Sequence, residues 1–346
     1  MVPWKRLVTQ SLIPAGLNSP EMILPLLKNL GTAELAVVFQ GSDVMFALPI
    51  EERRKRGLLS SLISPLTIMG TPHVDRDFPA AALTCFTQSL KRPLLLNSVN
   101  RKDSLWDHLA TPERHFAILE TWERAALKPA GTFESWLENN FDRKRRKEFR
   151  RLSNRLAEQG TFETVSFAPG DDSIPWASDL LALEQAGWKG KRGTAIAAMK
   201  PLQQAFAESC QQLAASGKLR FWKLVLDGKT IASMYAIVEA DQAWLGKIAY
   251  DENLARYSPG VLLILYATEM LFAESAIKVV DSCAIPGHPM IENIWRDRLP
   301  MADVMLAPQT ISAFRFAATV RLEKLRRMLR GTLRDIYYHL KGKKRS

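Results

Sequence analysis

Cysteine is scarce in this chain of 346 residues, which contains only three. Cys85, Cys210 and Cys283 are far apart, so they form neither a CxxC pair nor an even set. This spacing argues against a disulfide framework and a cysteine-based zinc site, and it favours a reducing compartment. The GxSxG, HExxH and P-loop signatures are missing too, so no serine-hydrolase, zinc-protease or P-loop chemistry is indicated.

Long apolar runs are also missing. The first residues, MVPWKRLVTQSLIPAG, contain no apolar core of the length that a signal peptide needs. The longest apolar run, residues 261–273, is interrupted by Glu269 and falls short of the about 20 residues that span a bilayer. We therefore predict a cytoplasmic protein without a membrane span, with peripheral contact to the inner membrane left open.

Charge is plentiful but unevenly distributed. The formal net charge is +11, of which residues 315–346 contribute +9 and residues 143–155 contribute +7, so the rest of the chain carries −5. The protein is thus a mildly acidic body with two basic patches. Such patches favour partners rich in phosphate, namely nucleic acid, anionic lipid or a phosphorylated cofactor.

The second half of the chain has the clearest pattern of strands and helices. Residues 219–250 predict three strands, with a hairpin turn at Asp227-Gly228 and another turn at 240–242. A helix should begin at Ser258-Pro259-Gly260, because serine suits the N-cap and proline suits the first helical position. A buried strand, "IKVVDSCA", a short helix containing "MIENIWRDR" and a strand, "ADVMLA", follow.

The first half repeats this order. We predict a hairpin of "ELAVVFQ" and "VMFALPI", a third strand at "SPLTIMG", a helix at "PAAALTCFTQSL", a strand at "PLLLNSV", a helical turn at "SLWDHL" and a strand at "HFAILETW". The repeat indicates an α+β fold of two tandem domains, each with a mixed, mostly antiparallel sheet flanked by helices.

Two basic segments are expected to be helices. In the first, Phe149, Leu152 and Leu156 share one face, and Gly160 ends the helix. The second is an amphipathic tail, which either packs on the protein's own surface or contacts an anionic membrane through residues 315–346. Its apolar stripe consists of Ala318, Leu322, Leu325, Leu329, Ile336 and Leu340, opposed by Arg326, Arg330 and Arg334.

Three stretches carry a resemblance to a known family: "RKRRKEFRRLSNRLAEQG", "WKGKRGTAI" and "YDENLARYSPGVLL". With the strand order, they resemble the GNAT acyltransferase superfamily and, more narrowly, the cellulose-biosynthesis-associated (CelD-like) acetyltransferases with tandem GNAT domains. The likeness covers roughly residues 20–307. It implies a GNAT-like domain without cofactor at 1–140, a basic connecting helix at 141–160, an acyl-CoA-binding GNAT-like domain at 161–310 and a basic amphipathic tail at 311–346.

The resemblance implies acetyl-CoA or another acyl-CoA as co-substrate, with its pantetheine arm between the strands at 243–250 and 277–283. The pyrophosphate would lie on the amides at the start of the helix. The cofactor-binding residues would be Arg256, Tyr257, Ser258, Pro259, Gly260, Val261 and Leu262. The first half has Asp75 and Asp77 at the corresponding place, where phosphate would be repelled.

Acyl transfer needs a base for the acceptor and donors for the developing oxyanion, and it needs no metal. The candidate bases are Glu184, Asp281 and His288. Tyr250 is a candidate acid for the departing thiolate. Trp188 and Lys189 are candidates for binding substrate, and a nucleophilic Cys283–His288 pair is a less favoured alternative.

Three functions compete for this sequence. The leading prediction is an acyl-CoA-dependent N- or O-acyltransferase, most simply an acetyltransferase, whose acceptor is a small molecule, a sugar or an envelope precursor. The second is a transferase that takes its acyl group from aminoacyl-tRNA, for which the basic face of residues 143–155 would suit the phosphates. The third is a non-catalytic protein bound to a membrane or, less favoured, to nucleic acid.

Overall fold

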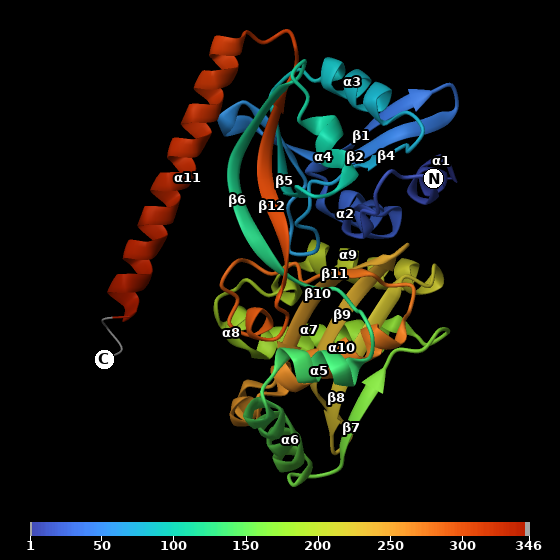
Figure 1. The fold of residues 1–346 in the computed structure, drawn as a ribbon, viewed down its shortest axis with the longest axis vertical. Coiled ribbons are helices and arrows are strands. Elements are labelled where there is room, and N and C mark those ends of the chain that lie inside the picture. The colour runs from blue at the N-terminus through green and yellow to red at the C-terminus, as the bar shows by residue number, and fades with distance from the viewer. Residues whose placement is uncertain (1, 343–346) are drawn as a thin grey trace.

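The computed structural model describes the backbone of residues 2–342 and the side chains of residues 3–333. The first half of the chain lies above the second in the view of Figure 1, and a long C-terminal helix stands beside the upper half. The predicted tail residues Arg334, Ile336 and Leu340 lie outside the described side chains.

The first half contains a mostly antiparallel sheet flanked by short helices. Its elements are α1 (Val2–Thr9), η1 (Gly16–Asn18), α2 (Pro20–Leu30), β1 (Ala33–Gln40), β2 (Asp43–Arg53), η2 (Arg54–Arg56), β3 (Leu58–Ser61), β4 (His73–Val74), α3 (Pro79–Ser89), β5 (Leu94–Asn100), α4 (Ser104–Leu109) and β6 (His115–Leu127).

The second half repeats the plan after two connecting helices. Its elements are α5 (Phe133–Asn140), α6 (Arg143–Ala157), β7 (Phe162–Ser166), α7 (Ser173–Ala186), α8 (Trp188–Lys191), η3 (Ile196–Ala198), α9 (Lys200–Ala215), β8 (Leu219–Leu226), β9 (Lys229–Glu239), β10 (Gln242–Tyr250), η4 (Glu252–Tyr257), α10 (Pro259–Ala273), β11 (Val279–Asp281), η5 (Ile291–Asn293), β12 (Asp297–Ala307) and α11 (Ala313–Gly342).

The two halves share one sheet of 12 strands, in the order β1-β2-β3-β5-β12-β6-β11-β10-β9-β8-β7, with β4 paired to β2 off this path. Strands β6 and β12 run antiparallel to each other through both halves. The end of β6 pairs with β11 of the second half, and the end of β12 pairs with β5 of the first. Each half therefore takes one segment of strand from the other (Figure 1).

Most of the predicted elements are confirmed, and the α+β fold of two tandem domains is observed. The turn at Asp227-Gly228 has φ values of 49° and 75°, as a two-residue hairpin turn requires. Two predictions are wrong. The third strand of the first half is β3, whereas "SPLTIMG" is a loop. In "MIENIWRDR", only Ile291–Asn293 form a short 3-10 helix, η5, and the last two residues begin β12.

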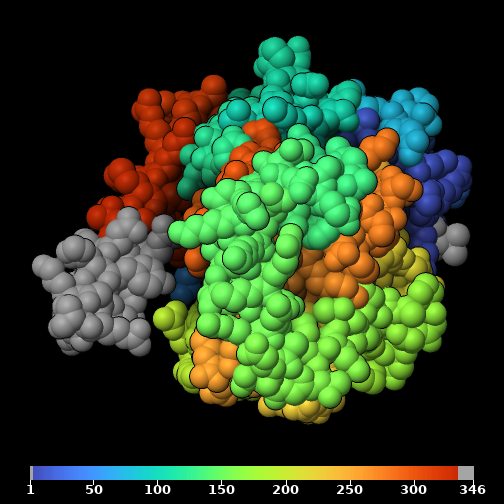
Figure 2. Space-filling view, turned by 60° about the horizontal axis from the view of Figure 1, so that its bottom comes forward, coloured from blue at the N-terminus to red at the C-terminus, as the bar shows by residue number. Residues whose placement is uncertain are grey.

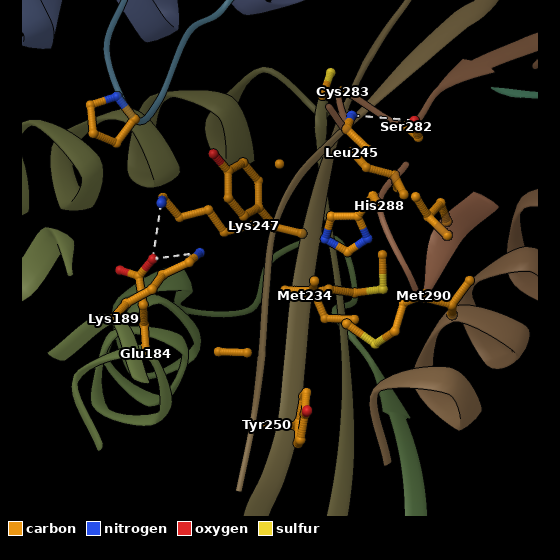
Figure 3. Close-up of a pocket in the computed structure, with 18 of the residues that line it drawn as sticks. Glu184, Lys189, Met234, Leu245, Lys247, Tyr250, Ser282, Cys283, His288 and Met290 are labelled. Atoms are coloured by element: carbon orange, nitrogen blue, oxygen red, sulfur yellow. Dashed lines mark hydrogen bonds and ion pairs between the residues drawn. The ribbon is translucent and has the colours of Figure 1, made fainter. Parts of the chain in front are cut away.

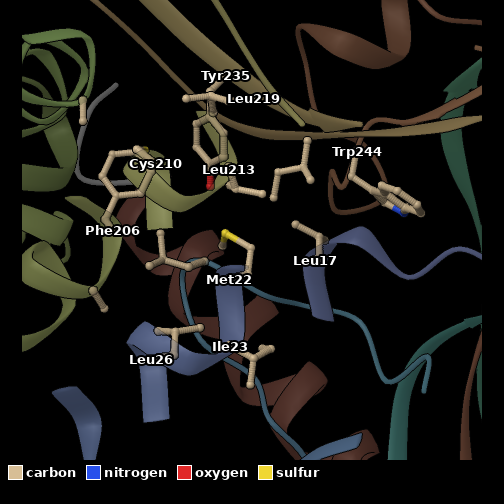
Figure 4. Packing of buried hydrophobic residues seen from close by; sticks show 14 of the residues in the cluster. Leu17, Met22, Ile23, Leu26, Phe206, Cys210, Leu213, Leu219, Tyr235 and Trp244 are labelled. Carbon is tan, nitrogen blue, oxygen red and sulfur yellow. The ribbon is translucent and has the colours of Figure 1, made fainter. Parts of the chain in front are cut away.

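An apolar cluster joins the two halves. Helices α2 and α9 pack together, and side chains from both point into the same space below the sheet (Figure 4). Met22 and Leu26 come from the first half, and Phe206, Leu213 and Tyr235 come from the second. All five are almost completely buried, so separating the halves would expose a large apolar area to water.

A buried polar network also crosses between the halves. The Glu239 carboxylate lies 3.3 Å from Nε2 of His73 and accepts bonds from the Ala15 amide at 2.9 Å and from Lys218 Nζ at 3.1 Å. Burial alone would raise the pKa of Glu239, but His73, Lys218 and the Ala15 amide outweigh it and lower the pKa to about 2. Glu239 is therefore ionised at neutral pH.

We expect the unfolding free energy of Glu239→Gln to fall less steeply in acid than that of the wild type. Because the folded pKa of Glu239 is lowered from 4.5 to about 2, the stabilisation is complete above 4.5 and is lost as pH falls towards 2. The wild type should lose about 3 kcal/mol more unfolding free energy than the variant between pH 5 and pH 2. Urea unfolding across this range measures the difference.

The matched control is Glu208→Gln, which removes a surface ion pair between α9 and Lys28 of α2. The unfolding free energy of this variant should fall with pH as that of the wild type does, because exposed ion pairs contribute little to stability. An equal fall of the unfolding free energy with pH in the wild type and in Glu239→Gln would contradict the prediction.

Candidate active site

A cavity of about 680 Å³ opens where β10 and the chain after β11 separate. The two strands pair in parallel from Gln242↔Val279 to Trp244↔Asp281, after which the chain turns away at Cys283, where φ is 54°. Strand β10 continues to Tyr250 paired with β9 alone, and it bulges at Gly246 and Lys247. The resulting gap lies between two neighbouring strands within the sheet and leads into the cavity (Figure 3).

Glycine is required at the bulge. A Cβ at position 246 would lie 2.0 Å from Cζ of Tyr235, whose ring is fully buried against β10. The close approach of this ring lets the strand shift register, and the shift brings the Lys247 side chain to the cavity.

One buried carboxylate holds two lysines at the cavity wall. Oε1 of Glu184 accepts bonds from Lys247 Nζ at 2.9 Å and Lys189 Nζ at 3.2 Å, and Oε2 accepts the Ile196 amide at 2.8 Å. Figure 3 shows both lysines converging on Glu184. Two cations against one anion leave the group with a net positive charge when both lysines are protonated.

Burial would raise the pKa of Glu184, but the Ile196 amide and the two lysines outweigh it and lower the pKa. Burial lowers the pKa of Lys247, and the neighbouring Lys189 lowers it further against the opposing effect of Glu184. An ionised, fully bonded Glu184 is a poor proton acceptor at neutral pH. The geometry therefore fits Glu184 as the residue that positions the lysines.

His288 lies in the loop that forms the other wall. Burial, together with the charge of Lys189, lowers the pKa of His288 below its ordinary value, so the ring is neutral at neutral pH. Its buried Nδ1 has no hydrogen-bond partner among the described residues. A neutral imidazole with an unused nitrogen at a cavity can accept a proton.

Cys283 lines the same cavity as His288. Burial raises the pKa of the Cys283 thiol well above its ordinary value, so almost no thiolate is present at neutral pH. Since the thiolate is the nucleophile, this environment disfavours a Cys283–His288 nucleophilic pair.

Trp188 lies at the mouth of the cavity. Its side chain is 52% exposed and its amide donates to Oε1 of Glu252 at 2.7 Å. The Arg192 guanidinium lies 5.0 Å from the ring centroid. An exposed indole beside cations is a surface on which a substrate can stack.

The start of α10 differs from the prediction. Ser258 adopts the left-handed conformation, with φ 52°, and its side chain does not cap the helix. The amides of Val261 and Leu262 both donate to the Ser258 carbonyl, and the Ser258 amide donates to Ala255. Of the amides expected to hold phosphate, only that of Gly260 lacks an acceptor among the described residues.

The helix end is also covered by side chains. A Cβ on Gly260 would lie 2.7 Å from Sδ of Met290 and 3.1 Å from Cδ1 of Tyr250. Tyr257 and Pro259 are buried, whereas Arg256 is exposed with its guanidinium 4.7 Å from the Tyr257 ring centroid. None of the predicted cofactor-binding residues lines the cavity itself, because Met290 and Tyr250, which do line it, lie against Gly260.

The structure does not bring Asp281 to the cavity. Its carboxylate accepts a buried bond from Arg124 Nη1 of β6 at 3.0 Å and a half-buried bond from the Cys283 amide at 2.7 Å. Asp281 instead borders a separate pocket of about 180 Å³. Tyr250 does line the large cavity, at the α10 end and apart from the Glu184 group (Figure 3).

Two contributors to the cavity are absent from the sequence-based prediction. Lys247 is one, although a lysine within the apolar strand "AWLGKIAY" is unusual and could have indicated a candidate site residue. The other is the loop after β3, from which Pro65, Leu66 and Ile68 reach the cavity of the second half. No local pattern indicates that contact.

The corresponding gap in the first half is filled by the chain itself. Strands β3 and β5 pair in parallel at Leu59↔Leu94 and then separate. The Gly70 amide donates to the Asn97 carbonyl at 2.5 Å, and Ser61 Oγ accepts the Asn97 amide at 3.2 Å. A Cβ on Gly70 would lie 2.5 Å from the Asn97 nitrogen, so the loop fits tightly between the strands.

The described residues contain no cluster of three or more His, Cys, Asp or Glu that could hold a metal ion. The site therefore consists of a neutral histidine, two lysines on a buried carboxylate and an apolar cavity at a strand separation. Such a site can accept a proton and stabilise a developing oxyanion, which are the two functions that acyl transfer needs.

A family comparison matches part of the chain. Residues 143–287 match the model of the Acetyltransferase (GNAT) domain family, so the GNAT-type match lies on the second half of the chain. The match spans α6 to β11 and includes Glu184, Lys189 and Lys247. No curated protein sequence matches the chain.

Solved structures share the fold of nearly the whole chain. A conserved protein of unknown function from Bacteroides thetaiotaomicron has a TM-score of 0.56 at 13% identity, covering 88% of this chain and 97% of that one. FemX has a TM-score of 0.55 at 10% identity, covering 88% and 94%. L-PGS from Bacillus licheniformis has a TM-score of 0.52 at 14% identity, covering 88% and 97%. At these identities the likeness establishes the fold alone.

Proposed function

We propose that this protein transfers an acyl group, most simply acetyl, from the thioester of an acyl-CoA to an amine or hydroxyl of a small acceptor. The observation that carries the proposal is the separation of β10 from the chain after β11, which opens directly onto the Glu184, Lys247 and His288 side chains. A narrow arm such as pantetheine fits between two such strands, and its thioester would end beside the charged group.

In the proposed reaction His288 accepts the proton of the acceptor as its nitrogen or oxygen attacks the acyl carbonyl. A C–N or C–O bond forms, the C–S bond breaks and the thiolate leaves. The ammonium groups of Lys189 and Lys247 stabilise the negative charge that develops on the carbonyl oxygen. Tyr250 lies at the α10 end, against Gly260 and apart from the lysines, so the proton that His288 accepts is the one available to the departing thiolate.

We propose that the pyrophosphate of the donor lies over the start of α10. The free Gly260 amide and the exposed Arg256 would hold it, with the positive end of the helix dipole beneath. Binding there requires the Met290 side chain to turn aside, since it now covers Gly260.

The acceptor would enter between the two halves. Leu17, Leu66 and Ile68 of the first half line the cavity together with the lysines of the second half. We propose an acceptor with an apolar part and an anionic group, because the lysines outnumber the carboxylate they share. The CelD-like resemblance supports a sugar or envelope precursor. The filled gap at Gly70 supports a first half that shapes the acceptor site and holds no cofactor.

A second candidate donor is aminoacyl-tRNA. FemX, whose fold this chain shares, is an aminoacyl-tRNA-dependent transferase. Helix α6 presents Arg143, Lys144, Lys147 and Arg150 to solvent, and none of them has a carboxylate partner in the described part of the chain. These four cations suit a phosphate backbone.

Titration calorimetry with acetyl-CoA and with CoA tests the proposal. We expect saturable binding by the wild type. Gly260→Gln and Gly260→Glu both displace Met290, but only Glu brings a negative charge to the phosphates. We therefore expect Gly260→Glu to bind about tenfold more weakly than Gly260→Gln.

If the wild type bound neither ligand at modest salt, acyl-CoA would be ruled out as the donor. Aminoacylated tRNA would then be titrated at several salt concentrations. Binding that weakens steeply with salt would identify tRNA as the donor, because cations that contact phosphates release counterions.

A further inference from the structure

The C-terminal helix contacts the body by a face other than its apolar stripe. Phe316 is buried with Leu119 and Met305 in a small apolar cluster, and Val320 packs against it. Glu323 is also buried and pairs with Arg56 at 3.5 Å. These residues recur at helical spacing, so they define the inner face of α11.

Ion pairs fix this orientation. Arg327 bonds Asp303 of β12 at 2.5 Å and Glu120 of β6 at 3.2 Å, and it returns to Glu323 at 3.3 Å. Burial lowers the pKa of Arg327, but Asp303, Glu323 and Glu120 outweigh it and raise the pKa, so its charge is permanent. The helix is therefore held on the β6–β12 strand pair by its polar face as well as by Phe316.

The predicted apolar stripe consequently points away from the body. Its members Leu322, Leu325 and Leu329 are 67%, 48% and 53% exposed, and Leu333, on the same side, is 66% exposed. Among the described residues this part of the stripe is open to solvent, although α11 itself packs on the protein's own surface through Phe316 and Arg327. Figure 2 shows the described part of α11 as a ridge at the edge of the molecule.

The charges beside the stripe are of one sign. Among residues 313–333, Arg315, Arg321 and Lys324 are exposed, whereas the single acidic residue, Glu323, faces the body. The sequence after Leu333 adds five basic residues and one acidic residue. A second copy of the same helix would bring like charges together, whereas an anionic lipid surface would neutralise them.

From this arrangement we infer that α11 lies flat on an anionic membrane surface, with Leu322, Leu325, Leu329 and Leu333 in the acyl-chain boundary and the arginines at the headgroups. An exposed leucine row flanked by cations is the pattern of interfacial helices. Within residues 2–342, no helix is long and apolar enough to cross a bilayer. The inference concerns attachment alone and does not depend on the proposed reaction.

Co-sedimentation of the full chain with vesicles tests the inference. We expect binding to phosphatidylcholine vesicles that contain phosphatidylglycerol, and little binding to phosphatidylcholine alone. Leu325→Gln/Leu329→Gln should bind at least tenfold more weakly, because two leucines no longer enter the lipid. Arg321→Gln/Lys324→Gln should bind about 25-fold more weakly, at about fivefold per charge.

Phe39→Gln is the matched control, because Phe39 is an exposed apolar residue of β1, 58% accessible and far along the sheet from α11. It should bind vesicles as the wild type does. Thermal unfolding of each variant verifies that the fold is intact.

Two outcomes would overturn the inference. The first is equal sedimentation of the wild type and both double variants with anionic vesicles. The second is a dimer in light scattering that Leu325→Gln/Leu329→Gln converts to a monomer, with no vesicle binding by the wild type. That result would assign the stripe to a second copy of this chain.

Discussion

Replacing Glu184 by alanine is expected to cost about 3–5 kcal/mol of unfolding free energy and to abolish acyl transfer. The substitution leaves Lys247 buried without a counter-charge and the Ile196 amide without an acceptor. It also frees Lys189, and with it α8, from the wall of the cavity. Urea unfolding and an acyl-transfer assay measure the two effects.

A double-mutant cycle separates the charge from the hydrogen bonds. Glu184→Gln retains an oxygen for the Ile196 amide, and Lys247→Met removes the buried cation. We expect each single variant to be destabilised and the double variant to be more stable than the sum of the two effects predicts, by about 1–3 kcal/mol. Strictly additive effects would show that Glu184 and Lys247 do not act as a pair.

His288→Gln is expected to lower kcat by about 10²–10⁴-fold while leaving stability nearly unchanged. Glutamine keeps polar atoms near the position of the ring but cannot accept a proton at neutral pH. In the wild type, kcat/KM should fall as pH falls through the lowered pKa of His288, because the protonated ring is no longer a base. The variant should lack this limb of the pH profile.

His108→Gln, in α4 of the first half and outside the cavity, is the matched control and should retain the wild-type profile. If His288→Gln kept both its rate and its acid limb, the base would have to be another group. Lys247 would then be the residue to replace, since burial lowers its pKa towards neutrality.

Local sequence patterns predict much of the second half. The Asp227-Gly228 turn and the two apolar strands that it joins depend on neighbouring residues, so they can be predicted from the sequence directly. The inner face of α6, with Phe149 and Leu156 buried, follows from helical spacing in the same way.

Long-range pairing cannot be read in this way. Strand β12 has an ordinary strand pattern, and nothing within it indicates that Val304 pairs with Leu96 of the first half. The loop at residues 64–70 resembles a strand in sequence because it is apolar. Its apolar side chains instead line the cavity, and its end lies between β3 and β5. Tertiary contacts override the local preference there.

The candidate site shows the same division. His288, Lys189 and Glu184 were accessible from the sequence as residue types suited to the chemistry, and the structure brings them to one cavity. Asp281 and Arg124 form a buried pair instead, a role that depends on the neighbouring strand β6. The left-handed Ser258 also escapes prediction, because serine ordinarily caps a helix in an extended conformation.

The strand exchange has a consequence for synthesis of the chain. A ribosome releases the residues of β1 to β6 long before those of β12, yet β12 lies between β5 and β6 in the finished sheet. The first half therefore emerges with two strand edges open and cannot complete its sheet until residue 307 has left the exit tunnel. The nascent chain must keep these edges from pairing elsewhere during that interval, so the two halves mature together as one unit.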